Sequence, residues 1–264
     1  MPTNNITILG DINKQLLGLT DQHIHYLANE CLTKKNPPNK SLANDNARKP
    51  IQALSKSTIG IHQQMNAAFK ALRHSAKTAG IDLKIASGFR SFERQLQIWN
   101  SKFSGKATIK KANGEIVDIS RLSDWEIIEA ILLYSALPGA SRHHWGCDID
   151  VYAPNLLANG ESLQLEPWEY QQSGPMAALS SWLTQHAAEF GFYLPYDCYR
   201  GGIAAEPWHL SFAPLATQYQ ATFKLQALQA CLINTDIAGK MVIIDNLTEI
   251  AKRYINNVNT RLSI

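Results

Sequence analysis

The chain carries the stretch Ser141-Arg142-His143-His144-Trp145-Gly146-Cys147-Asp148-Ile149-Asp150 near its middle. A histidine and an aspartate seven residues apart would share one face of a helix. Gly146 and the apolar–polar alternation after it predict instead a turn that enters a β-strand. Asp148 and Asp150 would then project from the same face of that strand, because side chains alternate along it. The stretch therefore places an imidazole at a turn beside carboxylates on a rigid strand.

A second polar stretch, Glu206-Pro207-Trp208-His209, follows about sixty residues later. Together the two stretches offer two imidazoles and a carboxylate as metal ligands, with a further glutamate beside them. A catalytic zinc site takes three protein ligands with nitrogen or oxygen donors and leaves a fourth position for water, whereas structural zinc takes four protein ligands. The pattern therefore indicates a catalytic metal site, with the spare carboxylate of Glu206 as a candidate base.

Helices and strands are mixed along the rest of the chain, without the regular alternation of a doubly wound sheet. Apolar residues at steps of three and four predict helices over 22–31, 59–79, 92–103, 127–137, 175–190, 215–233 and 242–258. Apolar–polar alternation predicts strands over 82–86, 147–152 and 208–212. Asn113-Gly114 predicts a hairpin turn, and Ser123 and Glu126 have the spacing of a helix capping box. Arg90 falls at a junction between a strand and a helix.

Composition limits the classes of partner. With 45% hydrophobic and 18% charged residues, the chain has the composition of a soluble globular protein. We expect no transmembrane segment, because no run of about eighteen apolar residues is present. The net charge of +3 is spread along the sequence, which argues against a nucleic-acid partner. The chain carries no signal for its oligomeric state.

Three motifs resemble the zinc D-alanyl-D-alanine carboxypeptidases and dipeptidases of the VanY type. This family lies within a wider group that includes lysostaphin-type peptidases and hedgehog signalling domains. Its SxHxxGxxxD pattern is met by Ser141, His143, Gly146 and Asp150, and its ExWH pattern by Glu206, Trp208 and His209. Its SGYRS pattern is met by Ser87-Gly88-Phe89-Arg90-Ser91. The motifs occur in the family's order, and the resemblance spans roughly residues 55 to 215.

The resemblance implies a Zn²⁺ ion held by His143, Asp150 and His209. It also implies that Glu206 is the general base and that Arg90 faces the substrate. Because an arginine is always charged and donates in a fork, Arg90 could stabilise the tetrahedral oxyanion or bind a substrate carboxylate. Ser141 is expected to donate a hydrogen bond to the substrate or to serve as a turn residue.

The chain departs from the family at Asp148, where the family usually has a small residue, often alanine. Asp148 could compete for the metal or orient a ligand histidine by a hydrogen bond. We expect Asp150 to be the ligand, because its spacing matches the family. His144 is expected to be a pocket wall or surface residue, Trp145 a pocket wall and Trp208 a core residue.

The expected fold is α+β, with a small antiparallel sheet that carries the zinc ligands, packed with helices. We expect an N-terminal extension and linker over 1–50, a catalytic domain over 51–215 and a helical extension packed on that domain over 216–264. The segment 153–174, between the second and third expected ligands, is a candidate for shaping the cleft.

The expected reaction is removal of the terminal D-alanine from a peptidoglycan stem peptide or muropeptide. Two alternatives stay open: an endolysin-like L-alanyl-D-glutamate endopeptidase, and a non-catalytic zinc-bearing binding module. Substrate choice depends on loops that the motifs do not describe. Residues 1–6 lack the basic start and apolar run of a secretory signal, so we expect a cytoplasmic protein acting on recycled muropeptides, or a periplasmic one if the sequence is trimmed.

Overall fold

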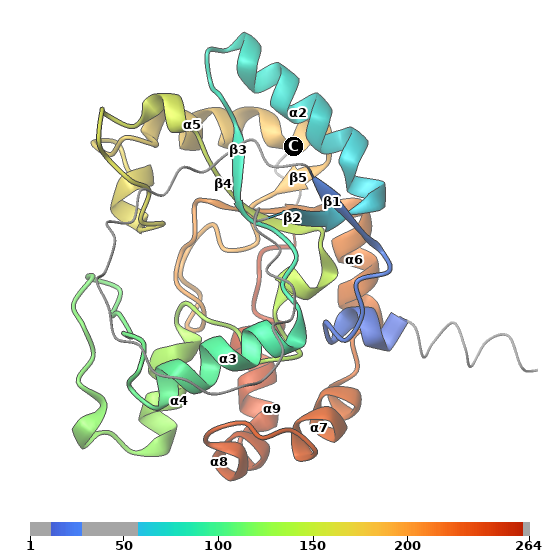
Figure 1. The fold of residues 1–264 in the computed structure, drawn as a ribbon, viewed down its shortest axis with the longest axis vertical. Helices are drawn as coiled ribbons and strands as arrows, with labels where there is room; N and C mark the ends of the chain where they lie inside the picture. Colours follow the sequence, from blue (N-terminus) through green and yellow to red (C-terminus); the bar gives the residue numbers. More distant parts are fainter. Residues whose placement is uncertain (1–11, 28–57, 261–264) are drawn as a thin grey trace, which may run out of the picture.

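The computed structural model describes residues 12–27 and 58–260, with a four-stranded sheet at the centre (Figure 1). The strands lie in the spatial order β3 (Lys84–Ser87), β4 (Asp148–Tyr152), β6 (His209–Phe212) and β5 (Phe192–Tyr193). All three pairings between neighbouring strands are antiparallel. Helices pack around this sheet, and the prediction of an α+β fold with a small antiparallel sheet is confirmed.

Strand β4 lies between two partner strands and is buried along its whole length. Ile149 and Val151 belong to the apolar core, so Asp148 and Asp150 project from the opposite face. The register with β6 pairs Asp150 with His209. Because a shift of one residue would exchange the two faces of the strand, burial of the apolar residues also determines where the carboxylates point.

Two helices, α2 (Asn66–Thr78) and α5 (Ala177–His186), lie on one side of the sheet (Figure 1). Their buried residues include Leu72 of α2 and Leu183 of α5, which share one hydrophobic core with the apolar side of β4. The apolar face of the sheet is therefore covered by these helices, and its polar face is left for the site.

A second hydrophobic core lies on the other side of the sheet (Figure 1). It joins α3 (Phe92–Phe103) and α4 (Asp124–Leu132) to the C-terminal helices α7 (Leu225–Ile233), α8 (Lys240–Asp245) and α9 (Leu247–Ile250). Trp99 of α3 is fully buried there and donates its indole N–H to the carbonyl of Ala238 at 3.0 Å. The C-terminal helices thus brace α3.

Short helical turns complete the fold. Helix α6 (Ala213–Thr222) follows β6 directly, and residues 12–16 are also helical. The 3-10 turns are Gln63–Met65, Ile119–Arg121, Arg142–Trp145, Pro154–Leu156, Pro167–Tyr170 and Ala187–Phe190, and the segment Ala251–Ile255 is π-helical.

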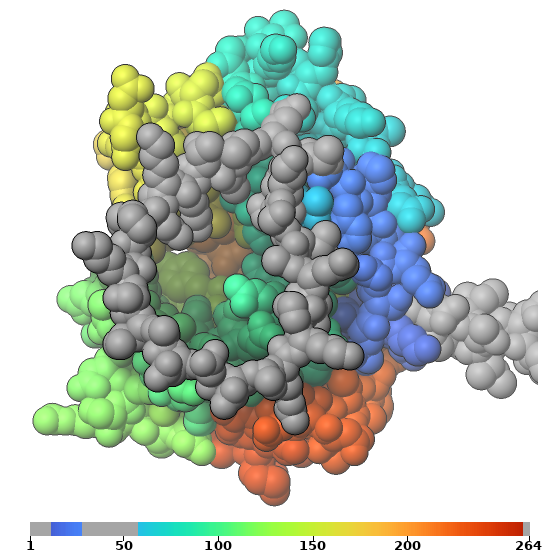
Figure 2. Space-filling model, in the orientation of Figure 1, coloured from blue at the N-terminus to red at the C-terminus, as the bar shows by residue number. Residues whose placement is uncertain are grey.

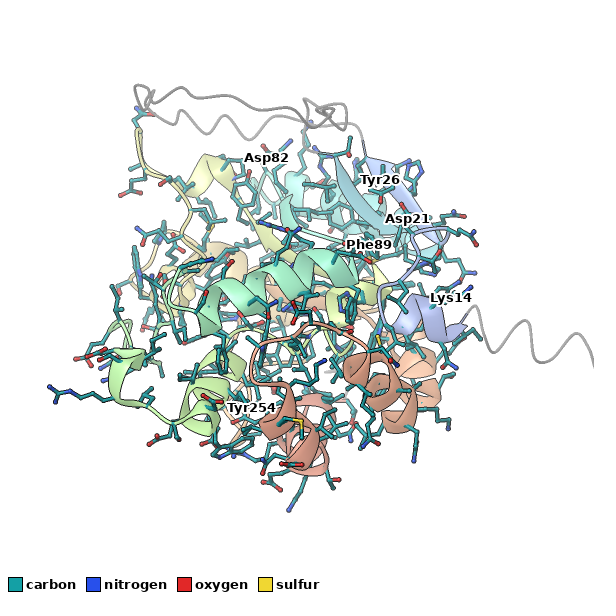
Figure 3. All side chains as sticks on the ribbon, turned by 60° about the horizontal axis from the view of Figure 1, so that its bottom comes forward. Lys14, Asp21, Tyr26, Asp82, Phe89 and Tyr254 are labelled. Atoms are coloured by element: carbon teal, nitrogen blue, oxygen red, sulfur yellow. The ribbon has the colours of Figure 1, made fainter. Side chains whose placement is uncertain are left out.

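The N-terminal part of the chain forms a strand where we predicted a helix. Within the predicted helix 22–31, β1 (Ile24–Leu27) pairs antiparallel with β2 (Ile59–His62), and residues 28–31 lie outside the described residues. The predicted helix over 59–79 therefore starts later, after β2. Apolar residues at positions 59, 61 and 65 fit both a strand and a helix, and the partner strand decides between them. Figure 3 shows Asp21 and Tyr26 at this ribbon, where the Tyr26 hydroxyl donates to the carboxylate at 2.8 Å.

Other local predictions are confirmed in part. Ser123 and Glu126 form a capping box at the start of α4, which ends at Leu132, earlier than the predicted 137. Gly114 lies in the expected turn with φ 84°, although only one bridge, between Lys110 and Ile116, forms across the hairpin. The predicted helix 242–258 is divided between α8, α9 and the π-helical segment.

The division of the chain into three regions stays a prediction. The expected boundary between 215 and 216 falls within α6, which is continuous across it. Leu16 and Leu17, from the expected N-terminal extension, are buried in the two hydrophobic cores. The expected linker over 33–50 lies outside the described residues. Of the helices in the described ranges, none has the length and apolar character that crossing a bilayer requires.

We predict that Ile250→Ala lowers the free energy of unfolding by about 2–5 kcal/mol, because it leaves a cavity in the second core. The measurement is chemical denaturation. The matched control is Met241→Ala, since Met241 is 70% exposed and should change stability by less than about 0.5 kcal/mol. Equal effects of the two substitutions would show that the C-terminal helices do not brace the domain.

Candidate active site

A tight turn before β4 presents His143 to the site. Residues Arg142–Trp145 form one turn of 3-10 helix, and Gly146 ends it in the left-handed region with φ 69°. A Cβ at Gly146 would overlap the side chain of Ile24, so this position requires glycine both for its backbone angle and for the close approach of β1. The turn therefore explains the glycine of the sequence motif.

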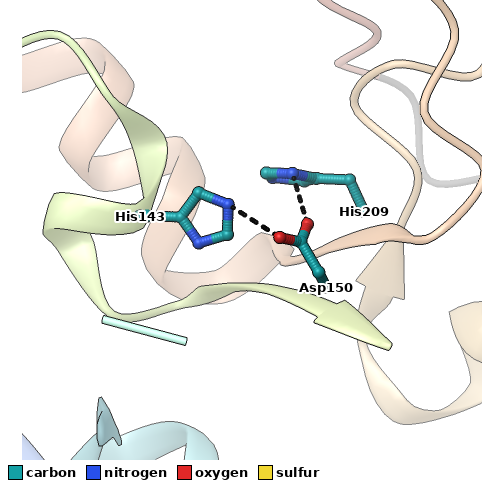
Figure 4. A group of neighbouring side chains, drawn as sticks. All are labelled: His143, Asp150 and His209. Carbon is teal, nitrogen blue, oxygen red and sulfur yellow. Dashed lines mark ion pairs between the residues drawn. The ribbon is translucent and has the colours of Figure 1, made fainter. Parts of the chain in front are cut away.

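Three expected ligands come together on the polar face of the sheet (Figure 4). His143 Nε2 lies 3.4 Å from Asp150 Oδ2, and His209 Nδ1 lies 3.2 Å from Asp150 Oδ1. One ligand atom from each of the three residues lies within 4.8 Å of the others, and all three side chains are buried. The geometry is that of a site able to hold one metal ion.

Hydrogen bonds orient both imidazole rings so that one ring nitrogen of each histidine points its lone pair at the other expected metal ligands. His143 Nδ1 lies 3.0 Å from the carbonyl oxygen of Gly88, which can only accept, so Nδ1 carries the proton. His209 Nε2 lies 3.1 Å from Asp148 Oδ1, which likewise favours a proton on Nε2. His143 Nε2 and His209 Nδ1 are then the free donors to a metal.

Two buried polar atoms without a hydrogen-bond partner indicate that a cation binds between them. Asp150 Oδ1 and His209 Nδ1 are buried and have no hydrogen-bond partner among the described residues. With the proton of His209 on Nε2, these two atoms are both acceptors and face each other at 3.2 Å. Burying unpaired polar atoms is unfavourable, and a divalent cation between them would satisfy both. The donor set therefore fits a metal.

Asp148 lies on the other side of the His209 ring from Asp150, so it orients the ligand and does not face the metal group. It is fully buried and accepts a hydrogen bond from Arg142 Nε at 2.7 Å. Arg142 also donates to three side-chain oxygens, those of Tyr193, Ser211 and Gln220. Of the two roles that the sequence left open for Asp148, the geometry favours the second.

Glu206 lies beside the three expected metal ligands, His143, Asp150 and His209, but is not one of them. This set of three ligands is called the metal group below. Its Oε2 is 3.3 Å from His209 Nδ1, and its backbone N–H donates to the carbonyl of Tyr196 at 2.9 Å. Burial raises the pKa of Glu206 above its usual value, because the charged carboxylate is desolvated. A buried carboxyl with a raised pKa is suited to accept a proton and give it back.

Arg90 extends from the junction before α3, and its guanidinium is fixed by two neutral acceptors. Nη1 donates to Gln95 Oε1 at 2.9 Å and Nη2 donates to Ser87 Oγ at 3.2 Å. Gln95 is fully buried and donates in turn to the carbonyl of Ala136 at 2.6 Å. Sequence reasoning missed Gln95, although it is a polar residue on the apolar face of α3 between Phe92 and Trp99.

These residues surround one cavity of ≈ 380 Å³. The face shown in Figure 2 is hollowed near its centre. The expected site residues Arg90, Ser141, His143, Asp150, Glu206 and His209 all line the cavity. Lining residues that the sequence analysis did not identify include Lys102, Lys110, Tyr134, Tyr196 and Ile203. They were missed because they belong to none of the motifs and follow no recognisable pattern.

The segment 153–174 contributes Gln164, Leu165 and Glu166 to the cavity wall, as expected for a segment that shapes the cleft. Leu165 has φ 56°, an unfavourable backbone angle for a residue with a side chain. The buried carboxylate of Glu169 accepts hydrogen bonds from the backbone N–H groups on both sides, those of Gln164 and Glu166. This carboxylate therefore holds the segment in place.

Two expectations about neighbouring residues, His144 and Trp145, are wrong. His144 is neither wall nor surface: it is fully buried, its Nδ1 donates to the carbonyl of Arg90 and its Nε2 accepts from the N–H of Gly139. Burial lowers the pKa of His144 to about 3, so it stays neutral. Trp145, expected to be a pocket wall, is a core residue. Trp208 belongs to the same core, as expected, and also lines the cavity. A sequence motif does not show on which side of a strand or turn an aromatic ring packs.

A family model described as VanY, D-alanyl-D-alanine carboxypeptidase, matches residues 58–215. An uncharacterized protein of Haemophilus influenzae is 38% identical over 121 residues, which cover 45% of this chain and 92% of that protein. The D-alanyl-D-alanine carboxypeptidase of Enterococcus faecalis is 24% identical over 168 residues, which cover 61% of this chain and 51% of that protein. The chain thus spans about half the length of this second relative.

Two solved structures are similar over most of the chain. A structure described as VanYB in complex with D-alanine-D-alanine has a TM-score of 0.43 and 24% identity, and the match covers 71% of this chain and 93% of that one. The LdcB LD-carboxypeptidase has a TM-score of 0.41 and 22% identity, with coverage of 74% and 69%.

We predict that Asp148→Asn lowers the affinity for Zn²⁺ by about 10- to 100-fold, because the carboxylate that orients His209 is lost. Competition with a chromogenic chelator measures the affinity, and the melting temperature with and without Zn²⁺ reports folding. Asp245→Asn, at an exposed position, is the matched control. Unchanged affinity in Asp148→Asn would contradict the orienting role.

Proposed function

The chain belongs to the VanY family of D-alanyl-D-alanine carboxypeptidases, and on this premise we propose that it is a zinc peptidase that removes the terminal D-alanine from peptidoglycan stem peptides. The observation that carries the proposal is one cavity that holds a three-ligand metal group, a separate buried carboxylate and an arginine. A binding module has no need of a base beside the metal ligands, so the retained Glu206 favours an enzyme.

His143, Asp150 and His209 would hold the zinc ion. Two nitrogen donors and one oxygen donor match a catalytic zinc site. When bound, zinc acts as a Lewis acid toward the scissile carbonyl and lowers the pKa of water to about 7. The hydrogen bonds from His143 to Gly88 and from His209 to Asp148 keep both rings turned toward the ion.

Glu206 is the general base in this proposal. Its carboxylate takes the proton of the attacking water and then returns this proton to the leaving amine of D-alanine. Burial raises its pKa, which favours both transfers near neutral pH. The 3.3 Å distance between Glu206 Oε2 and His209 Nδ1 places the base directly beside the metal group.

Arg90 supplies positive charge to the substrate. Its guanidinium is held by Gln95 and Ser87, and the remaining N–H groups are available to the oxyanion of the tetrahedral intermediate or to a substrate carboxylate. Ser141 is buried and lines the same cavity, where its hydroxyl could donate to the peptide.

The first experiment is mass spectrometry of a pentapeptide muropeptide incubated with zinc-loaded protein. Loss of one alanine supports the carboxypeptidase. Cleavage between L-alanine and D-glutamate would replace it with the endopeptidase, and bound zinc without any product would favour the binding module.

We predict that Glu206→Gln reduces the rate of D-alanine release by about 10²- to 10⁴-fold, because an amide cannot accept the proton of water. The zinc content, measured by atomic absorption, should not change, because Glu206 is outside the three-ligand group. Glu249→Gln, on an exposed part of α9, is the control for the loss of a carboxylate. Full activity of Glu206→Gln would exclude its role as base.

We predict that Arg90→Lys lowers kcat/KM by about 10- to 100-fold, because an ammonium cannot reproduce the fork that Gln95 and Ser87 fix. Steady-state kinetics with the same muropeptide measures the effect. The control is Arg94→Lys, since Arg94 is exposed on the neighbouring turn of α3 and should keep normal activity. A normal rate for Arg90→Lys would mean that only charge matters at this position.

A further inference from the structure

Lys102 is a further cationic side chain in the candidate active site. It lies near the end of α3, seven residues after Gln95 and three after Trp99, so it extends from the inward face of that helix. Its side chain lines the same cavity as Arg90 and the metal group. Lys102 has no part in the sequence motifs.

Two other cations of the cavity wall differ from Lys102 and Arg90, because they have carboxylate partners. Arg142 is paired with Asp148, and Lys110 is paired with Glu166. Lys102 Nζ donates to the neutral hydroxyl of Ser135 at 2.6 Å. Among the described residues, no carboxylate lies within ion-pair distance of Lys102 Nζ.

The surroundings of this ammonium favour an anionic ligand. Burial, and then the charge of Arg90, lower the pKa of Lys102, whereas Glu206 acts weakly in the opposite direction. A partly desolvated ammonium next to another cation is unfavourable in the free protein. A carboxylate bound between the two cations would relieve both the desolvation and the repulsion.

The positions of Arg90 and Lys102 indicate that the two side chains contact different parts of the substrate. Both cations interact electrostatically with Glu206, but Arg90 also interacts with Asp150, so Arg90 is the cation nearer the expected metal ligands. Lys102 lies twelve residues further along the chain, at the far end of α3. A carboxypeptidase substrate ends one residue beyond the scissile carbonyl, and an extended residue spans about 3.3–3.6 Å. Lys102 and the expected metal ligands line one cavity of ≈ 380 Å³, which would receive this short segment.

We propose that Lys102 binds the C-terminal carboxylate of the substrate, while Arg90 meets the scissile carbonyl oxygen. This inference rests on the proposed carboxypeptidase function and assigns its preference for a free chain end to Lys102. An endopeptidase would have a neutral amide at this place, which an ammonium with a single hydroxyl partner would bind poorly.

The test compares two synthetic peptides, L-Ala-D-Glu-L-Lys-D-Ala-D-Ala with a free C-terminal carboxylate and the same peptide with a C-terminal amide. We expect the wild type to cleave the free acid at least about 10-fold more efficiently than the amide. Lys102→Met should lower kcat/KM for the acid by about 10- to 100-fold, mainly through KM, and leave the amide unchanged. Lys102→Arg should restore most of the preference.

Lys106→Met, four residues further on and exposed, is the matched control and should keep the wild-type preference. Equal losses on acid and amide in Lys102→Met would overturn the proposal, because they indicate a structural role. Equal cleavage of the two peptides by the wild type would overturn it as well. A wild type that releases neither D-alanine from the acid nor D-alanine amide from the amide would refute the proposed function and this inference together. D-alanine release without any effect of Lys102→Met refutes only the inference.

Discussion

The antiparallel pairing of β4 with β6 is the constraint on which the site depends. It sets Asp150 beside His209, and a shift of one strand by one residue would turn the ligand on that strand to the other face of the sheet. The register is held by the burial of Ile149 and Leu210 in the first hydrophobic core. The burial that stabilises the sheet thus also brings two of the three expected ligands, Asp150 and His209, together.

The buried charges behind the ligands form a second layer of this arrangement. Asp148 accepts from both Arg142 and His209, and the guanidinium of Arg142 also lies 4.5 Å from the centroid of the Trp145 ring. Neither Arg142 nor Asp148 would be tolerated alone at this burial, because an unpaired buried charge is costly. The aspartate that replaces the family's usual small residue is therefore linked to its arginine partner.

The second hydrophobic core controls the substrate side of the site. Helix α3 carries Gln95 and Lys102 and begins directly after Arg90, and its Trp99 is anchored to the chain before α8. The C-terminal helices lie far from the metal group in sequence, yet they determine where these polar side chains stand. The positions of the expected metal ligands depend on the sheet, whereas the positions of Gln95 and Lys102 depend on the packing of α3.

The sequence by itself determined the features whose chemistry is local. The histidines, Asp150, Glu206 and Arg90 were identified because their residue types and spacing carry the signal within a few positions, and the capping box at Ser123 likewise depends on one helical turn. Only the tertiary structure decided that residues 24–27 form a strand, that Asp148 orients His209, that Gln95 holds Arg90 and that Lys102 reaches the cavity. Each of these outcomes depends on a partner distant in sequence or on the face toward which a side chain packs, and a pattern along one chain does not contain that information.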